Sequence, residues 1–176
     1  VEYDIILQPG HYGRKTGKVG TSGELVSERA LVAYVVGAAA RQLGKQNVNV
    51  LVVSADQYST GLRAKVFLAV HADGSESKCK TGPSLAYEAS SSPHAMHAIG
   101  WGLAQAMGYV YKDFMRDNFT ANEANYYMFG KVKAGTMKGL LEVGELTCAK
   151  MEEQLVLNAD AIAENLARAL AFVVGK

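Results

Sequence analysis

The stretch KVFLAVH at residues 65–71 decides the fold, because it is apolar almost without interruption until it ends in a histidine. A strand that is apolar on both faces indicates a parallel sheet that is covered on both sides. The same character recurs in YDIILQ near the start of the chain, where Pro9 and Gly10 end the apolar run. The strands expected from these patterns cover residues 3–8, 48–53, 65–71, 82–89 (at an edge of the sheet) and 138–143.

Segments with the spacing of amphipathic helices separate these strands. Ser27 has the side chain of a helix N-cap, and the apolar residues after it keep helical spacing up to Gly44. A second helix is expected from Ser92 to about Met107, and residues 149–174 are expected to form one long C-terminal helix. The pattern predicts the α/β class in three layers, with a mostly parallel, mixed sheet of about six strands and helices on both faces.

Two segments lack a regular pattern. Residues 113–125 are polar and poorly periodic, and long connections of this kind often carry function. Residues 126–132 fit neither a helix nor a strand clearly. Within them, Tyr126 and Tyr127 are suited either to stacking on sugar rings or to partial burial at a sheet edge.

Length and composition favour a single globular domain over residues 1–176. Apolar residues make up 49% of the chain, and the net charge of +1 gives no electrostatic reason to expect a nucleic-acid partner. No membrane association is expected either, because no apolar stretch is long enough to cross a bilayer. The first residues do not have a signal-peptide pattern, which does not exclude export.

The chain has two cysteines, Cys79 and Cys148, which are too few for a cysteine-based zinc knuckle. A pair of cysteines in a domain of this size says little about the redox state of its compartment. The favoured interpretation is two free thiols, with a single disulfide as the alternative.

Polar residues with catalytic potential fall at the predicted ends of the strands. His11 follows the first strand, His71 ends the third, and Glu142 lies near the end of the last one. Glu28 opens the first helix, at the same edge of the sheet as the loop that carries His11. Because loops and helix N-termini converge outside the carboxyl ends of parallel strands, these side chains are expected to meet there.

Two histidines and one glutamate are the ligands of many catalytic zinc sites, which keep a fourth position open for water. A further carboxylate is then needed as the general base, and Glu142 is the candidate. Each residue also has a plainer interpretation. His11 and His71 can be polar strand ends, Glu28 can interact with the helix dipole, and Glu142 has no role if its side chain points away from the sheet.

Four stretches together resemble a known family, the zinc-dependent N-acetylmuramoyl-L-alanine amidases of the Amidase_3 type. That family begins with a strand and a Pro-Gly-His turn, continues with a glutamate at the head of the first helix and a strand that ends in histidine, and closes with a Leu-Val-Glu-x-Gly-like stretch. The matching stretches here are ILQPGHYG (6–13), GELVSERAL (23–31), FLAVHADGS (67–75) and LLEVGELT (140–147). They occur in the family's order and span nearly the whole chain.

The resemblance implies that His11, Glu28 and His71 hold Zn²⁺ and that Glu142 is the catalytic acid/base. Glu24 competes with Glu28 for the ligand position, and Glu28 is preferred because it directly precedes the apolar helix face. The implied reaction is hydrolysis of the amide that joins N-acetylmuramic acid to L-alanine in peptidoglycan, by a monomer. Arg116 is a candidate to pair with a carboxylate of the stem peptide; the alternative is a solvated surface arginine.

Two other functions compete with the amidase. One is a zinc carboxypeptidase or endopeptidase that cuts within the stem peptide, for which the same metal ligands would serve. The other is a non-catalytic cell-wall-binding domain, which the presence of all four candidate residues disfavours. The amidase interpretation places the action on the cell wall, either as a secreted or periplasmic autolysin or as a phage endolysin that is made in the host cytoplasm and released at lysis.

Overall fold

A five-stranded sheet forms the centre of the computed structural model, which describes residues 2–176. The strands lie in the order β2-β1-β3-β5-β4, and β4 alone runs antiparallel to its neighbour. The α/β class with a mostly parallel, mixed sheet is therefore confirmed, with five strands in place of about six. The strands are β1 (Tyr3–Pro9), β2 (Val50–Val52), β3 (Ala64–Asp73), β4 (Ser84–Tyr87) and β5 (Met137–Glu145).

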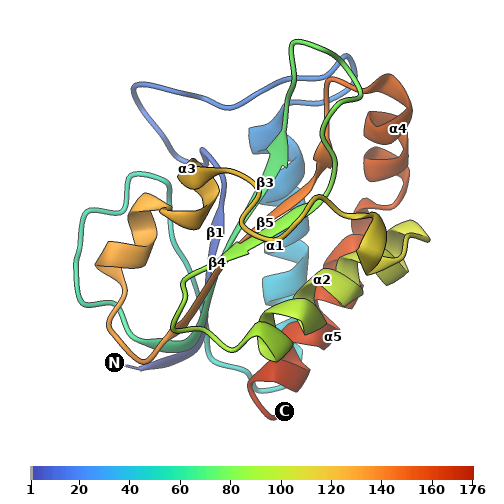
Figure 1. Cartoon of the computed structure of the whole chain (residues 1–176). Helices are drawn as coiled ribbons and strands as arrows, with labels where there is room; N and C mark the ends of the chain where they lie inside the picture. The colour runs from blue at the N-terminus through green and yellow to red at the C-terminus, as the bar shows by residue number, and fades with distance from the viewer. Residues whose placement is uncertain (1) are drawn as a thin grey trace.

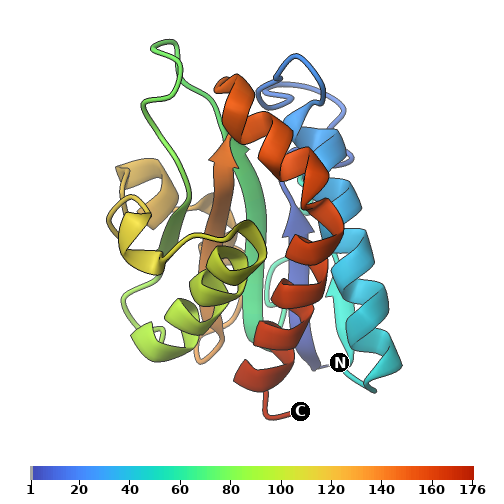
Figure 2. The ribbon, with the colours of Figure 1, turned by 90° about the vertical axis from the view of Figure 1, so that its right-hand side faces the viewer.

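The two faces of the sheet are covered unequally. Helices α1 (Glu28–Lys45), α2 (Pro93–Met107) and α5 (Ala159–Val173) cover one face, as Figure 2 shows. The other face is covered by the short helices α3 (Ala121–Ala124) and η2 (Tyr127–Lys131), which lie on the opposite side of the strands in Figure 1. The prediction of helices on both faces holds, but only one face carries long helices.

Strand β3 is continuously apolar because it contributes to both cores. Val66, Leu68 and Val70 pack under the long helices, whereas Phe67 and Ala69 pack under η2. Because side chains alternate between the faces of a strand, His71 follows Phe67 and Ala69 on the η2 face. By the same alternation, Ile6 leads to Gln8 in β1 and Leu140 leads to Glu142 in β5. This face is thus apolar along most of its length and polar at the carboxyl ends of its strands.

The first two long helices begin where the sequence predicts. The Ser27 side chain accepts a hydrogen bond from the Ala30 backbone N–H at 3.2 Å, and α1 ends at Lys45. Ser92 caps α2 in the same way, and α2 stops at Gly108, whose φ of 68° suits glycine. No helix within residues 2–176 is both long enough and apolar enough to span a membrane.

The prediction of one long C-terminal helix is wrong, because the segment forms two helices. Helix α4 (Ala149–Leu157) ends before Asn158, and α5 starts at Ala159. The break lies in the backbone of Asn158, whose φ of −101° and ψ of 10° depart from the helical values. The apolar spacing continues through this break, which explains why the periodicity did not reveal it.

The favoured interpretation of two free thiols is also wrong. Cys79, in the loop between β3 and β4, forms a disulfide with Cys148, which directly precedes α4. The two residues are 69 positions apart, so no local sequence signal announces the bond. The disulfide ties the loop after β3 to the first turn of α4.

Candidate metal centre

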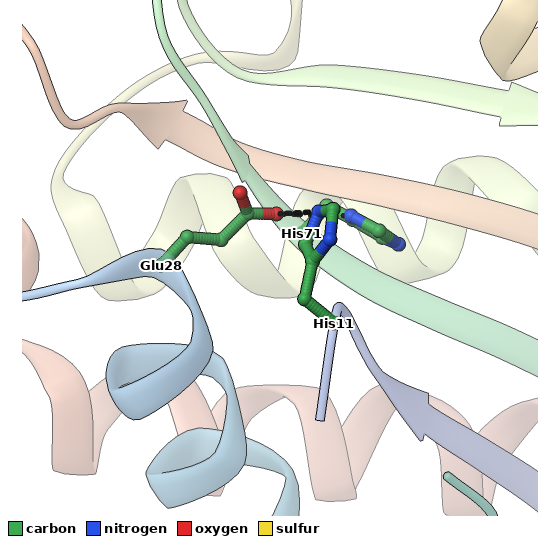
Figure 3. Close-up of side chains that lie close together, drawn as sticks. All are labelled: His11, Glu28 and His71. Carbon is green, nitrogen blue, oxygen red and sulfur yellow. Dashed lines mark hydrogen bonds and ion pairs between the residues drawn. The ribbon is translucent and has the colours of Figure 1, made fainter. Parts of the chain in front are cut away.

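His11, Glu28 and His71 come together at the carboxyl edge of the sheet, and their ligand atoms all lie within 4.8 Å of one another. Figure 3 shows the Glu28 carboxylate directed at both imidazole rings. Glu28 Oε1 lies 2.9 Å from His71 Nδ1 and 3.4 Å from His11 Nε2. Such a group can hold a metal ion. Glu24, the alternative to Glu28, is exposed and lies outside this group.

Local backbone features place each of the three side chains. His11 lies in the turn after β1 and has a φ of 58°, the left-handed conformation that a tight turn requires. The preceding Gly10 packs against the His71 ring, and a Cβ on Gly10 would lie 2.5 Å from His71 Nδ1. Glu28 is the first residue of α1 and accepts hydrogen bonds from the backbone N–H groups of Thr21 and Ala72.

Electrostatics keep the Glu28 carboxylate ionised. Burial opposes ionisation, but the hydrogen bonds from His11 and His71 outweigh it and lower the pKa of Glu28 to about 2. The hydrogen bond to Glu28 in turn raises the pKa of His11. The centre therefore presents a buried negative charge between two imidazoles, an arrangement that favours a cation.

Glu142 lies beside this group in β5, opposite His71 in the register of the two parallel strands. Its Oε2 is buried and has no hydrogen-bond partner among the described residues. Burial raises the pKa of Glu142 well above its ordinary value, and the nearby carboxylates of Glu28, Asp73 and Glu123 raise it further. An uncompensated buried carboxyl group of this kind indicates that a positive charge belongs near it.

The four residues border one cleft of about 650 Å³. Sequence reasoning missed its remaining polar lining. Asp73 follows His71 by two positions on the same strand, so the alternation of side chains along a strand could have indicated it. Glu123 belongs to the short helix α3, and no pattern in the sequence indicated it. The cleft is lined by His11, Lys18, Val19, Gly20, Thr21, Glu28, His71, Ala72, Asp73, Gly74, Thr120, Asn122, Glu123 and Glu142.

Arg116, the candidate partner of a stem-peptide carboxylate, lies outside this lining. It is exposed, and its guanidinium donates to the Phe119 carbonyl at 3.4 Å. A separate groove of about 660 Å³ lies between α2 and α5 and includes the exposed Trp101 and Phe172. That groove holds none of the candidate catalytic residues, so the cleft at the strand ends is the candidate active site.

Comparison with known proteins shows the fold. No family model matches the chain, and no curated protein matches it by sequence. Among solved structures, the N-acetylmuramoyl-L-alanine amidase AmiC2 of Nostoc punctiforme matches with a TM-score of 0.73 at 16% identity, over 98% of this chain and 97% of that one. The catalytic domain of CwlV, an N-acetylmuramoyl-L-alanine amidase from Bacillus (Paenibacillus) polymyxa var. colistinus, matches with a TM-score of 0.70 at 23% identity, over 96% of both chains.

The catalytic domain of the CD27L endolysin, which targets Clostridia difficile, also matches, with a TM-score of 0.70 at 13% identity over 97% of both chains. The coverage is nearly complete in each direction, so the likeness concerns the whole fold and not one motif. At these low identities the shared property is the fold, and the chemistry has to be argued from the residues of this chain.

Proposed function

We propose that this protein is a zinc-dependent N-acetylmuramoyl-L-alanine amidase that cleaves peptidoglycan. The observation that carries the proposal is the group of His11, Glu28 and His71 at the edge of a cleft, within a fold that N-acetylmuramoyl-L-alanine amidases share over nearly their full length. The composition of that group and the neighbouring Glu142 support hydrolysis more than simple binding.

The donor set fits zinc. Two imidazole nitrogens and one carboxylate oxygen are the ligands of several catalytic zinc sites, in which the fourth position is left to water or substrate. We assign these ligands to His11 Nε2, Glu28 Oε1 and His71 Nδ1, the atoms that face one another. When bound, zinc would acidify a water molecule and polarise the carbonyl of the scissile amide.

Glu142 is suited to the proton transfers of amide hydrolysis. Its carboxyl group lines the same cleft, and burial together with the neighbouring carboxylates raises its pKa, which makes the ionised group a stronger base. It would take the proton from the attacking water and then give a proton to the nitrogen of the leaving L-alanine. The burial of Oε2 without a partner leaves that oxygen available for this role.

The substrate assignment rests on the names of the proteins with the same fold, together with the open cleft. An open cleft accepts a peptide on a polymer strand more easily than an enclosed pocket does. Action on peptidoglycan places the protein at the cell wall, as an autolysin or as an endolysin. A metal peptidase acting on the stem peptide would use the same ligands, so product analysis must separate the two activities.

The test combines metal analysis with identification of the products. Purified protein should contain about one zinc per chain by the ligand count of such sites, and chelation should stop the digestion of purified sacculi. Mass spectrometry should find intact stem peptides with a free L-alanine N-terminus. Cuts between amino acids would reassign the protein as a peptidase, and protein that neither binds zinc nor releases any product would refute the proposal.

The variant Glu142→Gln separates catalysis from metal binding. It should keep its zinc and lose about 10²–10⁴-fold in turnover, because the amide cannot accept the proton. Glu153→Gln is the matched control, since Glu153 is exposed on α4 and lies outside the cleft. Equal turnover of the parent and Glu142→Gln would remove Glu142 from the mechanism.

A further inference from the structure

Partly buried hydrogen bonds connect His71 to residues that are not themselves ligands. His71 Nε2 lies 3.1 Å from the hydroxyl of Tyr126, and that hydroxyl lies 2.6 Å from Gln8 Oε1. Gln8 is fully buried, and its side-chain nitrogen donates to the Ser54 carbonyl at 2.9 Å. The chain of contacts thus runs from a backbone carbonyl through two side chains to an imidazole.

The Ser54 carbonyl fixes which group donates and which accepts in every hydrogen bond of this series. The Ser54 carbonyl can only accept, so Gln8 must present its NH₂ group there and its oxygen to Tyr126. The Tyr126 hydroxyl then donates its one hydrogen to Gln8, which leaves a lone pair toward His71. His71 Nε2 must therefore carry a hydrogen, so the neutral ring that binds a metal ion has its lone pair on Nδ1, the atom at which the metal-free ring shares a proton with Glu28.

A second contact strengthens the orientation of the Gln8 amide. Gln8 Nε2 also lies 3.4 Å from the hydroxyl of Tyr127, and that hydroxyl donates to the Ala55 carbonyl at 2.5 Å. The Tyr127 hydroxyl is thereby left as an acceptor for the amide N–H. Both hydrogens of the Gln8 amide are used on one side, so its oxygen has to face Tyr126.

We infer that Tyr126 and Gln8 are positioning residues that hold His71 in the tautomer with Nδ1 free for the metal. Nδ1 is the His71 nitrogen that faces Glu28 Oε1, so the imposed tautomer points its lone pair at the centre. A backbone carbonyl fixes the tautomer of His11 without intermediate side chains. Its Nδ1 lies 2.9 Å from the Lys18 carbonyl, which leaves the lone pair of the neutral ring on Nε2, the nitrogen that faces Glu28. The inference rests on the metal-binding role proposed above for these histidines.

The test measures zinc affinity in the variant Tyr126→Phe, by competition with a chromophoric chelator. Loss of the hydroxyl frees His71 to adopt the other tautomer and to rotate, and removal of an outer-sphere partner typically weakens metal binding about 10- to 100-fold. Gln8→Leu should weaken zinc binding as well, although Gln8 does not contact His71, because the Tyr126 hydroxyl is then free to donate to His71.

Tyr109→Phe is the matched control, because Tyr109 is partly buried and its hydroxyl makes one side-chain hydrogen bond, to Gln154, away from the cleft. It should keep the parent's zinc affinity. Nitrogen-15 spectra of the zinc-loaded protein supply a second readout: the parent should show a His71 Nε2-bound hydrogen that exchanges slowly with water, and Tyr126→Phe should lose it.

The outcomes distinguish this inference from the proposed function. A parent protein that binds no zinc would refute the function itself. A parent that binds zinc, together with Tyr126→Phe and Gln8→Leu variants of equal affinity and an unchanged His71 spectrum, would overturn the inference and leave the amidase proposal standing. Thermal midpoints of Tyr126→Phe and Tyr109→Phe show whether a loss of affinity merely follows a loss of stability.

Discussion

Gly10 shows how closely the metal centre is packed at the scale of single residues. Its Cα approaches the His71 ring so nearly that a Cβ would lie 2.5 Å from Nδ1, the atom assigned to the metal. No side chain can occupy that space unless the ring moves. A glycine is therefore needed at this position for steric reasons, independent of backbone conformation.

The variant Gly10→Ala should weaken zinc binding about tenfold or more, because the ring is displaced from a position that its partners fix. Gly44→Ala is the control, since a Cβ at Gly44 meets no heavy atom within 4 Å. Chelator competition measures both affinities. If Gly10→Ala binds zinc as tightly as the parent does, Nδ1 of His71 is not where the metal binds.

The residues of the centre were predictable to the extent that they end strands or begin a helix. His11 follows β1 and Glu28 begins α1, whereas His71 and Glu142 lie two and three residues before the ends of β3 and β5, and the structure brings all four to one cleft. The contact between Tyr126 and Gln8 joins residues that are 118 positions apart, and it depends on which face of the sheet η2 covers. Neither strand periodicity nor helix periodicity contains that information.

At the scale of elements, Glu152 of α4 holds the loop that leads into α1. It is buried, and its carboxylate accepts hydrogen bonds from the backbone N–H groups of Glu24, Leu25 and Val26, at 2.7–3.0 Å. Burial opposes the ionisation of Glu152, but these three donors outweigh it and hold its pKa below the ordinary value. The loop so held ends at Ser27, the N-cap of α1.

The variant Glu152→Gln should lose about 2 kcal/mol of unfolding free energy at neutral pH, because an amide cannot accept from all three donors with the strength of a charged group. A lowered carboxyl pKa stabilises the fold above the ordinary pKa of about 4.3, and that stability is lost as the pH falls through the folded-state value. The unfolding free energies of the parent and of Glu152→Gln should therefore converge in acid.

Urea unfolding of metal-free protein at neutral and acid pH measures this difference, with Glu153→Gln as the exposed control on the same helix. A gap between parent and Glu152→Gln that persists unchanged in acid would show that shape, and not charge, accounts for it.

The break between α4 and α5 is the other element-scale feature that periodicity could not reveal. The apolar spacing runs through Asn158, and only the backbone angles of that residue mark the break.

At the scale of the whole molecule, the disulfide joins the loop between β3 and β4 to the start of α4. It links Cys79 to Cys148 across 69 positions, so it removes much of the freedom of the unfolded chain. Glu145, which is fully buried, accepts hydrogen bonds from the backbone N–H groups of Cys79 and Thr81. The loop after β3 is therefore held in two independent ways.

The double variant Cys79→Ser/Cys148→Ser should lose about 2–4 kcal/mol of stability, which corresponds to a thermal midpoint about 5–15 °C lower. Its zinc affinity should change little, because Glu145 still holds the loop. Scanning calorimetry and chelator competition check both expectations. A thermal midpoint equal to the parent's would mean that the two thiols are not paired in the folded protein.

The overall architecture was predictable because two independent signals agree: apolar runs that suit buried strands, and capped helices between them. The number of strands and the unequal cover of the two faces were not, because residues 126–132 carry no clear periodicity and form the short helix η2. The disulfide could not be deduced either, since pairing depends on the distance between two loops in space.

The register of β3 against β5 has a further consequence for changes in chain length. His71 and Glu142 stand side by side because β3 and β5 keep one register from Val66 and Met137 up to this pair, after which the register shifts so that Asp73 lies opposite Glu145. One residue added or deleted before the pair, in either strand, would turn His71 or Glu142 to the reverse side of the sheet. In the part of each strand that precedes this pair, only changes by an even number of residues keep the two side chains on their present face. The loops outside the strands have no such constraint, so natural variants of this chain should differ in length there, and not by a single residue in β3 or β5 before His71 and Glu142.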